Sequence, residues 1–296
     1  MIISVASGKG GTGKTLVATS LALSLKDKYE VQLLDCDVEE PNDHIFLKPV
    51  ITVREEVFIP VPKIDEEKCT HCGKCAEVCA YHAIAVLPNS VLLFPHLCHG
   101  CGACSYFCPE NAIIEEGKEI GVIEFGEADG ISFIQGKLNV GEAMPVPVIR
   151  KVKERVNHEG VTIIDVSPGT SCPVVESIKD SDFCLLVTEP TLSGIHDLER
   201  VMEVCRHFNV PAVVCINKYD INENNTHQIE DYCRAQGVDV IARIAFDKVV
   251  TEAMVNGLPV VKYSDGKVSR QINLLWQNIV ERLTVNKGEH HADIRV

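Results

Sequence analysis

The chain has 296 residues, of which 46% are hydrophobic and 24% charged, and its formal net charge is −14. This composition is typical of a folded protein with one large α/β domain and room for a small one. The negative charge argues against nucleic acid or an anionic membrane as the main partner, because both attract Lys and Arg. No apolar run is long enough to cross a bilayer, and the N-terminus enters a strand at once. We therefore expect a cytoplasmic protein without a signal peptide.

Apolar runs that end in polar residues alternate with helical patterns along most of the chain. We expect buried strands at 2–6, 31–37, 161–170, 183–190 and 212–220, and helices at 15–27, 192–208 and 268–283. Continuous apolar runs are typical of parallel strands that are covered on both faces. The pattern predicts an α/β fold with a doubly wound, mostly parallel sheet, which binds ligands at the carboxyl ends of its strands.

The alternation stops between residues 61 and 118, where cysteines and histidines crowd together. This segment repeats itself with a period of 29 residues. The repeated positions are Cys69, Cys72, Gly73, Cys75, Cys79, Ala83 and Ile84, which recur as Cys98, Cys101, Gly102, Cys104, Cys108, Ala112 and Ile113. We predict a small domain over 61–118, inserted into a domain over 1–60 and 119–286, with the Pro-rich segment 58–65 as the connection. Residues 287–296 are expected to be a disordered tail.

Each half of the repeat has the form C-x2-C-x2-C-x3-C, "CTHCGKCAEVC" at 69–79 and "CHGCGACSYFC" at 98–108. Fourteen cysteines in a reducing compartment indicate metal rather than disulfides. The spacing resembles that of two-cluster bacterial ferredoxins, in which the fourth cysteine of each run ligates the other cluster. Structural zinc is the alternative, which two such runs disfavour. The resemblance implies one [4Fe–4S] cluster on Cys69, Cys72, Cys75 and Cys108, and a second on Cys98, Cys101, Cys104 and Cys79.

The segment "SGKGGTGKT" at 7–15 matches G-x-x-x-x-G-K-[ST] between a predicted strand and a predicted helix, the context that a phosphate-binding loop needs. Backbone N–H groups of such a loop surround the phosphates at the helix N-terminus. Its lysine reaches the β- and γ-phosphates and its hydroxyl binds Mg²⁺, roles that fall here to Lys14 and Thr15. The predicted nucleotide-binding residues of the loop are Gly8, Gly10, Gly11, Thr12, Gly13, Lys14 and Thr15.

The additional lysine in "KGGTGKT", Lys9, resembles that of the deviant phosphate loop shared by MinD, ParA and the nitrogenase iron protein. The resemblance implies ATP hydrolysis in a dimer, with itself or with a related chain, in which Lys9 reaches the partner's nucleotide. "LLDCDVEEPN" at 33–42 resembles the first switch, with Asp37 placing the attacking water and Asp35 nearby. "IIDVSPGT" at 163–170 resembles Walker B and the second switch, with Asp165 holding Mg²⁺ through water.

"INKYD" at 216–220 resembles the base-binding segment of the same family, with Asn217 touching the purine. The same residues form N-K-x-D, which indicates guanine in GTPases. The resemblance of the phosphate loop favours ATP over GTP.

Cys172 follows Asp165 by seven residues. The nitrogenase iron protein carries a cluster-ligating cysteine at a comparable offset, but its second ligand has no match in this chain. We therefore expect a switch thiol, inert or redox-active, rather than a bridging cluster. The cysteines in apolar contexts are expected to be buried; they are Cys36, Cys184, Cys205, Cys215 and Cys233.

Three functions follow from these motifs. The first is an ATP-dependent dimer that couples nucleotide state to electron transfer through two [4Fe–4S] clusters toward a redox partner. The second is an ATP-dependent carrier that delivers iron–sulfur clusters to a recipient protein; carriers of this superfamily use a separate CxxC, and this chain has none outside 69–108. The third is a MinD-like positioning ATPase, which needs a basic amphipathic tail that residues 284–296 lack. The motifs favour the first function.

Overall fold

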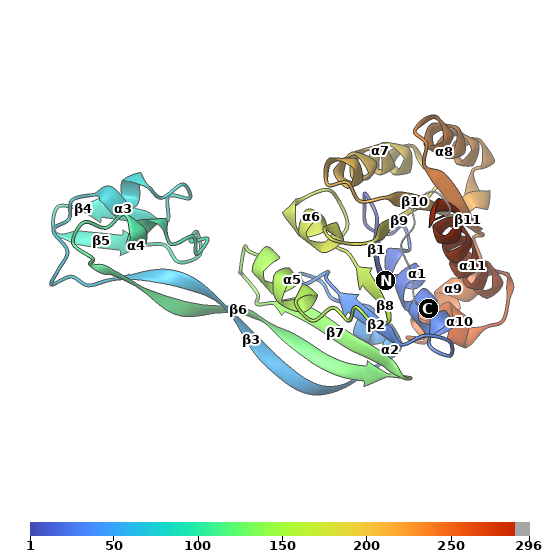
Figure 1. The fold of residues 1–296 in the computed structure, drawn as a ribbon, viewed down its shortest axis with the longest axis horizontal. Coiled ribbons are helices and arrows are strands. Elements are labelled where there is room, and N and C mark those ends of the chain that lie inside the picture. Colours follow the sequence, from blue (N-terminus) through green and yellow to red (C-terminus); the bar gives the residue numbers. More distant parts are fainter. Residues whose placement is uncertain (288–296) are drawn as a thin grey trace.

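The computed structural model describes the backbone of residues 1–287 and the side chains of residues 1–280. Within them a sheet of nine strands forms the middle layer, in the order β11-β10-β9-β1-β8-β2-β7-β6-β3 (Figure 1). The strands from β11 to β7 are parallel, whereas β7, β6 and β3 pair in antiparallel fashion. The strands are β1 (Ile2–Ala6), β2 (Val31–Asp35), β3 (Val50–Ile64), β6 (Ile113–Ala128), β7 (Ile131–Leu138), β8 (Val161–Asp165), β9 (Phe183–Thr188), β10 (Ala212–Asn217) and β11 (Asp239–Ile244).

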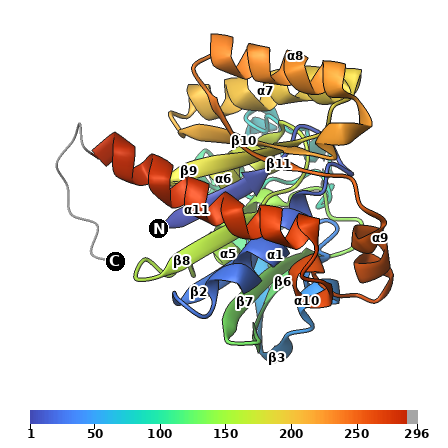
Figure 2. The ribbon, with the colours of Figure 1, turned by 90° about the vertical axis from the view of Figure 1, so that its right-hand side faces the viewer.

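Helices cover both faces of the sheet, which confirms the predicted α/β fold with a large, mostly parallel sheet (Figure 2). One face packs against α1 (Lys14–Leu25), α2 (Asp43–Leu47), α9 (Lys248–Val255), α10 (Val260–Tyr263) and α11 (Lys267–Lys287). The other packs against α5 (Val146–Lys153), α6 (Cys172–Ile178), α7 (Leu192–His207) and α8 (Glu223–Ala235). A short 3₁₀ turn, η1 (Tyr219–Ile221), follows β10.

Successive residues of a strand point to opposite faces, so a strand that is covered on both faces needs an unbroken apolar run. Ile163 and Ile164 of β8 show this, because both are fully buried but belong to the cores on opposite sides of the sheet. Leu33 and Leu34 of β2 divide in the same way. Each such side chain contributes roughly 2 kcal/mol through burial.

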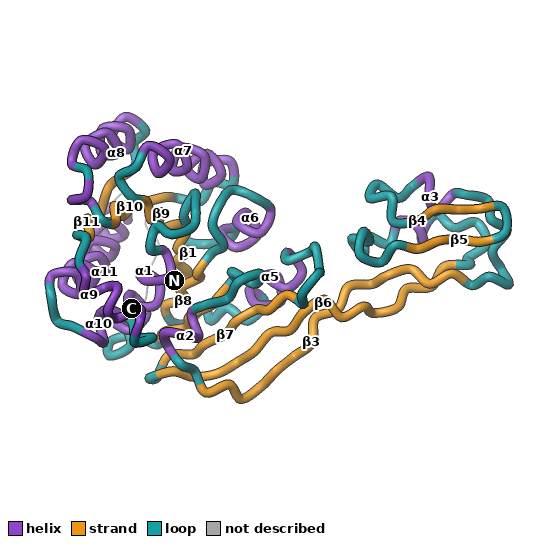
Figure 3. The backbone as a smooth tube through the Cα atoms, turned by 180° about the vertical axis from the view of Figure 1, so that it is seen from behind, coloured by secondary structure: helices purple, strands orange, loops and turns teal. Residues whose placement is uncertain are grey.

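β3 and β6, of 15 and 16 residues, are much longer than the other strands. β7 pairs with β6 only from Gly121 onward, so residues 58–64 and 113–120 leave the sheet as a two-stranded ribbon. At the point of departure the register shifts and Ile120 has no partner on β3, which is a β-bulge. Figures 1 and 3 show this ribbon projecting from the α/β body with a small unit at its end.

The Pro-rich segment 58–65, predicted to be a connection, is instead the outer part of β3 up to Ile64. Prolines lack a backbone N–H and are normally kept out of sheets. Pro60 and Pro62 are tolerated because β3 is the edge strand and pairs only with β6. The segment still joins the body to the inserted unit, but the prolines alone do not indicate that it does so as a strand, because that depends on its edge position.

Residues 65–112, called the inserted unit below, contain two helices of one turn, α3 (Lys74–Glu77) and α4 (Ala103–Tyr106). They also contain the hairpin of β4 (Ile84–Leu87) and β5 (Ser90–Leu93). Its small apolar core consists of Cys75, Ile84 and Ile113, with partly buried neighbours that include two further cysteines. A core of this size leaves most of the unit to be held together by other means.

β1, β2, β8, β9 and β10 run parallel, so their carboxyl ends meet at one edge of the sheet. None of the helices described over residues 1–287 combines the length and the apolar character that crossing a membrane requires. The predicted tail lies outside the described residues, apart from Lys287 at the end of α11.

Candidate functional site

A loop between β1 and α1 lies at the carboxyl edge of the sheet and carries the glycines of the phosphate-loop motif. Gly13 precedes α1 with a φ of 93°, and a Cβ there would lie 2.3 Å from Nδ2 of Asn217, so only glycine fits. Asn217, at the end of β10, donates from Nδ2 to the carbonyl oxygen of Thr12 over 2.7 Å. The predicted loop residues and Asn217 therefore meet at the N-terminus of α1, where backbone N–H groups favour phosphate.

Asp165, at the end of β8, joins the two residues that the motif assigns to phosphate and Mg²⁺. It accepts hydrogen bonds from Lys14 Nζ at 2.6 Å and from Thr15 Oγ1 at 2.7 Å. The side chains of Lys14 and Asp165 are 7% and 1% exposed. Burial alone would lower the pKa of Lys14, but the carboxylates of Asp165, Asp37 and Asp43 outweigh it and raise that pKa. A buried lysine beside carboxylates and a hydroxyl is suited to bind a nucleotide with its Mg²⁺.

Three further carboxylates lie at the end of β2 and in the segment that follows it. Asp35 is buried and accepts backbone N–H groups of Asp37, Asn42 and Asp43 at 3.0–3.1 Å, so it holds the loop 36–43 in shape. Burial and the nearby Asp165 raise the pKa of Asp35 to about 7. Asp37 is less buried, and desolvation raises its pKa too.

Asp43, the first residue of α2, was not singled out by the sequence analysis. It is fully buried, and no N–H or hydroxyl donor of the described residues reaches its carboxylate oxygens, which lie against the side chain of Asp165. Burial, followed by the charges of Asp165 and Asp35, raises its pKa well above the ordinary value. A carboxylate without a donor at this depth is costly, so its persistence points to a role in the site. The spacing of Asp35, Asp37 and Asp43 after one strand was the available signal.

Lys9 lies on the outer side of the phosphate loop and contacts the segment between β9 and α7. Its Nζ is 2.7 Å from Oε1 of Glu189 and also donates to Thr191 Oγ1 at 3.2 Å and Ser193 Oγ at 2.9 Å. Glu189 also binds Lys218, with 3.0 Å between Nζ and Oε2. The two lysines hold the pKa of Glu189 below its ordinary value, against the effect of burial. Glu189 was not predicted, and it is the residue that restrains Lys9 within its own chain.

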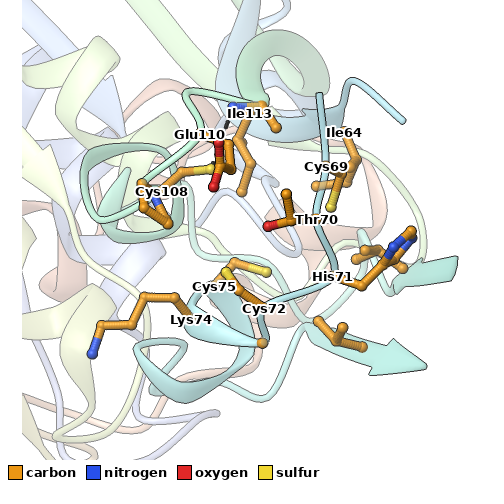
Figure 4. Close-up of a pocket in the computed structure, with 15 residues that line it drawn as sticks. Ile64, Cys69, Thr70, His71, Cys72, Lys74, Cys75, Cys108, Glu110 and Ile113 are labelled. Carbon is orange, nitrogen blue, oxygen red and sulfur yellow. Dashed lines mark hydrogen bonds between the residues drawn. The ribbon is translucent and has the colours of Figure 1, made fainter. Parts of the chain in front are cut away.

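The inserted unit contains a hollow of about 350 Å³ with four cysteines on its walls. Cys69, Cys72 and Cys75 come from the first half of the repeat and Cys108 from the second, and Figure 4 shows their side chains around this space. The remaining wall includes Val86, Val91 and Ile113. Tertiary structure thus brings together the first predicted ligand set, including its member from the other half.

A second hollow of about 390 Å³ has the complementary set of cysteines on its walls. Cys98, Cys101 and Cys104 come from the second half and Cys79 from the first, as the motif predicts. The hollow also touches the ribbon through Pro60 and Pro62.

The 29-residue repeat of the sequence also appears in the backbone conformation. Left-handed conformations occur in three pairs separated by 29 residues, with φ between 49° and 80°. These pairs are His71 and Gly100, Gly73 and Gly102, and His82 and Asn111. The N–H of Ala83 donates to Cys79 Sγ at 3.2 Å, and the N–H of Ala112 donates to Cys108 Sγ at 3.3 Å. Each exchanged cysteine therefore has the same turn and the same N–H···S contact.

Each hollow collects four thiols on its walls, and this donor set can be compared with the needs of a metal site. Among residues 1–287 no group of three or more His, Cys, Asp or Glu side chains is close enough to hold a single metal ion. Zinc needs its ligands within about 2.0–2.3 Å of one centre. Four cysteine thiolates are the ligand number of a four-iron cluster. Burial raises the pKa of Cys104 to about 11 and also raises that of Cys75, so ligation as thiolates would release protons.

Comparison with known proteins agrees with the nucleotide site. A family model described as the CobQ/CobB/MinD/ParA nucleotide binding domain matches residues 3–260. The chain belongs to this family. MinD of Pyrococcus horikoshii, solved with Mg-ADP, superposes with a TM-score of 0.61 at 19% identity, covering 99% of both chains, which shows a shared fold.

Two relatives extend the comparison beyond the fold. An uncharacterized protein of Methanocaldococcus jannaschii is 33% identical over 284 residues, covering 95% of this chain and 97% of the relative. An iron–sulfur cluster carrier protein of Pyrococcus horikoshii is 26% identical over 313 residues, covering 97% of this chain and 88% of the carrier. The chain is thus a member of a family of P-loop ATPases and is similar to proteins named for iron–sulfur clusters.

The six cysteines outside the repeat lie in two kinds of surroundings in this member of the MinD/ParA family. Five are buried and pack in the cores, namely Cys36, Cys184, Cys205, Cys215 and Cys233. Cys172 is exposed at the start of α6.

Proposed function

We propose that this protein binds and hydrolyses ATP as a dimer, and that its inserted unit folds as a ferredoxin-like domain with two [4Fe–4S] clusters. Nucleotide state would then control electron transfer between these clusters and a partner protein. The observation that supports this most is the pair of hollows, each with three cysteines from one half of the repeat and one from the other. Exchange of the fourth cysteine is the ligation pattern of two-cluster ferredoxins.

The nucleotide chemistry proposed for the carboxyl edge uses residues that are already in contact. Lys14 exchanges its contact with Asp165 for the β- and γ-phosphates, which frees Asp165 to hold Mg²⁺ through water beside Thr15. Asp37 orients the attacking water. Lys9 leaves Glu189 and stabilises charge on the partner's nucleotide, as an arginine finger does in other NTPases. Asn217 contacts the base while it holds Thr12.

A short chain of hydrogen bonds leads from the nucleotide site to the ribbon, which supports coupling. Val38 follows Asp37, and its carbonyl accepts the N–H of Leu138 at 2.8 Å. The next residue, Asn139, donates its N–H to the carbonyl of Ile120 at 2.8 Å. Ile120 is the bulge at which the ribbon leaves the sheet. A movement of the loop after Asp37 therefore reaches the base of the ribbon through two backbone bonds and one covalent step.

Lys118 and Glu142 add a second link between the ribbon and the loop after β7, at 2.8 Å. ATP can bias the position of the inserted unit only if that position differs in free energy between nucleotide states. When bound, the clusters would supply one-electron transfer; the chain's own residues supply their ligands, their placement and the link to ATP.

A second candidate function is delivery of iron–sulfur clusters to other proteins, and the Pyrococcus carrier supports it because its similarity covers nearly the whole chain. In that case the inserted unit would hold cargo rather than resident clusters. Four thiols for each cluster, with N–H···S contacts to Cys79 and Cys108, favour retention.

Counting iron during turnover separates the two functions. The full chain is reconstituted anaerobically, reduced, and mixed with Mg-ATP and an apo-ferredoxin acceptor; the proteins are then separated and iron is counted on each. We expect about eight irons to stay on this chain while ATP is consumed. Iron that moves to the acceptor only with ATP would establish the carrier function instead. A reconstituted chain that holds zinc and no iron would overturn both.

A further inference from the structure

The two hollows of the inserted unit have matched walls. Positions 29 residues apart occupy the same place in each, as Ala112 and Ile113 in the first hollow correspond to Ala83 and Ile84 in the second. Val91 in the first corresponds in the same way to Pro62 in the second. Because the local fold is the same in both halves, different residues at matched positions give the two sites different surroundings.

The two hollows differ in the residues of the strand pair that covers each of them. Over the first hollow, Val86 of β4 pairs with Val91 of β5. Over the second, Pro62 of β3 pairs with Glu115 of β6. Glu115 is the repeat equivalent of Val86, so a carboxylate stands over the second hollow where the first has an apolar side chain.

Contacts hold Glu115 over the cysteine loop. Its Oε1 accepts a hydrogen bond from Ser105 Oγ, and a Cβ at Gly102 would lie 3.1 Å from the same oxygen. Ser105 and Gly102 flank Ala103 and Cys104 of the second ligand set. The equivalent of Ser105 in the first half is Ala76, which has no side-chain donor. The carboxylate and its anchor are thus both particular to the second site.

The other charged wall residues do not cancel this difference. The first hollow also has a carboxylate on its wall, Glu110, but none of the described residues donates a hydrogen bond to it, whereas Ser105 holds Glu115 in place. In Figure 4 the Lys74 ammonium points away from the hollow, and it is paired with Glu77 at 3.0 Å. The walls of the second hollow include Glu115 and no lysine or arginine.

We propose that Glu115 sets the reduction potential of the cluster held by Cys79, Cys98, Cys101 and Cys104 below that of the cluster held by Cys69, Cys72, Cys75 and Cys108. This rests on the proposed function, because it requires clusters in both sites. Reduction adds a negative charge, which a neighbouring carboxylate opposes. An electron shared between the sites therefore leaves the second site oxidised and the first site reduced.

This order of potentials gives electron transfer within the inserted unit a preferred direction. The second hollow lies along the ribbon, at Pro60 and Pro62, whereas the first adjoins Ile64 at the end of β3 and the β4–β5 hairpin. Electrons thus rest at the site farther along the ribbon from the nucleotide-binding body. The charges on the walls therefore predict that an electron is stored at the site farther from the nucleotide-binding body. The site nearer the body is then the stronger reductant.

A redox titration of the reconstituted full chain tests this inference, with low-temperature EPR as the readout. The wild type is expected to show two one-electron steps. Glu115→Val, which copies the first site, should raise the lower midpoint by at least a tenfold change in the exchange equilibrium between the sites, or ~59 mV. Val86→Glu, which copies the second site, should lower the upper midpoint. Glu115→Gln keeps a hydrogen-bond partner for Ser105 and serves if the valine variant loses a cluster.

Glu116→Gln is the matched control. It removes one carboxylate from the next residue of β6, which pairs with Lys63 on the ribbon and does not line either hollow. Midpoints that stay in place in both Glu115 variants, as in the control, overturn the inference while about eight irons per chain leave the proposed function standing. A wild type without iron overturns the proposed function, and the inference with it.

Discussion

Asp43 lies in an environment that disfavours its negative charge. Its carboxylate is fully buried, receives no N–H or hydroxyl donor from the described residues and lies near the charges of Asp165 and Asp35. Natural proteins retain such groups where function needs them and stability suffers as a result. The cation that lowers the pKa of Asp43 is Lys14, and this lysine already pairs with Asp165.

Asp43→Asn should stabilise the nucleotide-free protein. Removing the charge relieves burial and repulsion, and we expect the free energy of unfolding at pH 7.5 to rise by about 1 kcal/mol, measured by urea denaturation. ATP hydrolysis is expected to fall in the same variant. Asp265→Asn, at an exposed aspartate before α11, is the control and should change neither. A less stable Asp43→Asn protein would contradict this account.

The difference in unfolding free energy between Asp43→Asn and the wild type should depend on pH, and its sign follows from the raised pKa of Asp43. An acid whose pKa is higher in the folded state binds its proton more tightly there, so the folded state loses stability as pH rises above the unfolded value, near 3.8. The difference between Asp43→Asn and the wild type should therefore be largest at neutral pH and should close as pH falls toward 4. A difference that is constant from pH 4 to 7.5 would show that the charge of Asp43 is not its cause.

At the scale of elements, the ribbon of β3 and β6 is an extension of a sheet that is complete without it. β7 ends its pairing with β6 at Gly121, and beyond that point the ribbon contacts the body through Ile120 and Lys118. The packed cores on both faces of the sheet include few residues from the ribbon, such as Ile59 and Ile120. The α/β body should therefore fold without the inserted unit.

Replacing residues 60–117 by Asn-Gly tests this. Ile59 and Lys118 are register partners, so a two-residue turn between them closes a hairpin. We expect the shortened chain to keep its nucleotide affinity within about threefold and to bind no iron, measured by calorimetry and metal analysis. Replacing 60–118 instead joins Ile59 to Glu119 one residue out of register, which turns side chains to the wrong face and should lower the unfolding midpoint. Equal stability of both variants would count against the role assigned to register.

At the scale of the whole molecule, the carboxyl edge of the sheet carries the residues proposed to bind the nucleotide, and the proposed dimer would have to form on this edge as well. Lys9 is held on this edge by Glu189, Thr191 and Ser193, and its side chain is 26% exposed. A transfer of Lys9 from Glu189 to a partner's phosphates exchanges one ion pair for another. Dimerisation should therefore depend on the triphosphate.

Lys9→Ala should remove this dependence. With Mg²⁺ and a non-hydrolysable ATP analogue, light scattering is expected to give a dimer for the wild type and a monomer for Lys9→Ala. Lys28→Ala, at an exposed lysine after α1, is the control and should remain a dimer. A wild type that stays monomeric with the analogue would contradict the proposed dimer.

Much of the body could be predicted because its signals are local. The strand at 2–6 and the helix at 192–208 follow from an apolar run and a helical period, and the structure gives β1 at Ile2–Ala6 and α7 at Leu192–His207. The phosphate loop is a contiguous motif in which Gly13 takes a left-handed conformation that glycine adopts without strain. The resemblance to two-cluster ferredoxins likewise predicted which thiols would share a hollow, and the sequence repeat on which it rests is also a repeat of the backbone.

The rest required distances between residues far apart in the chain. Nothing near Pro60 indicates an edge strand, since that depends on where β3 lies in the sheet. Glu189 pairs with Lys9 although the two residues are 180 positions apart in the chain. The pKa of Asp43 is raised by Asp165, which is also far from it in the sequence. Glu115 belongs to the second hollow only because β6 passes over it. By itself the sequence determined most of the elements, the phosphate-loop motif and the two cysteine runs, because these depend on local conformation and spacing. Tertiary structure alone decided which charges face one another, because electrostatic energy depends on separation in space and on burial.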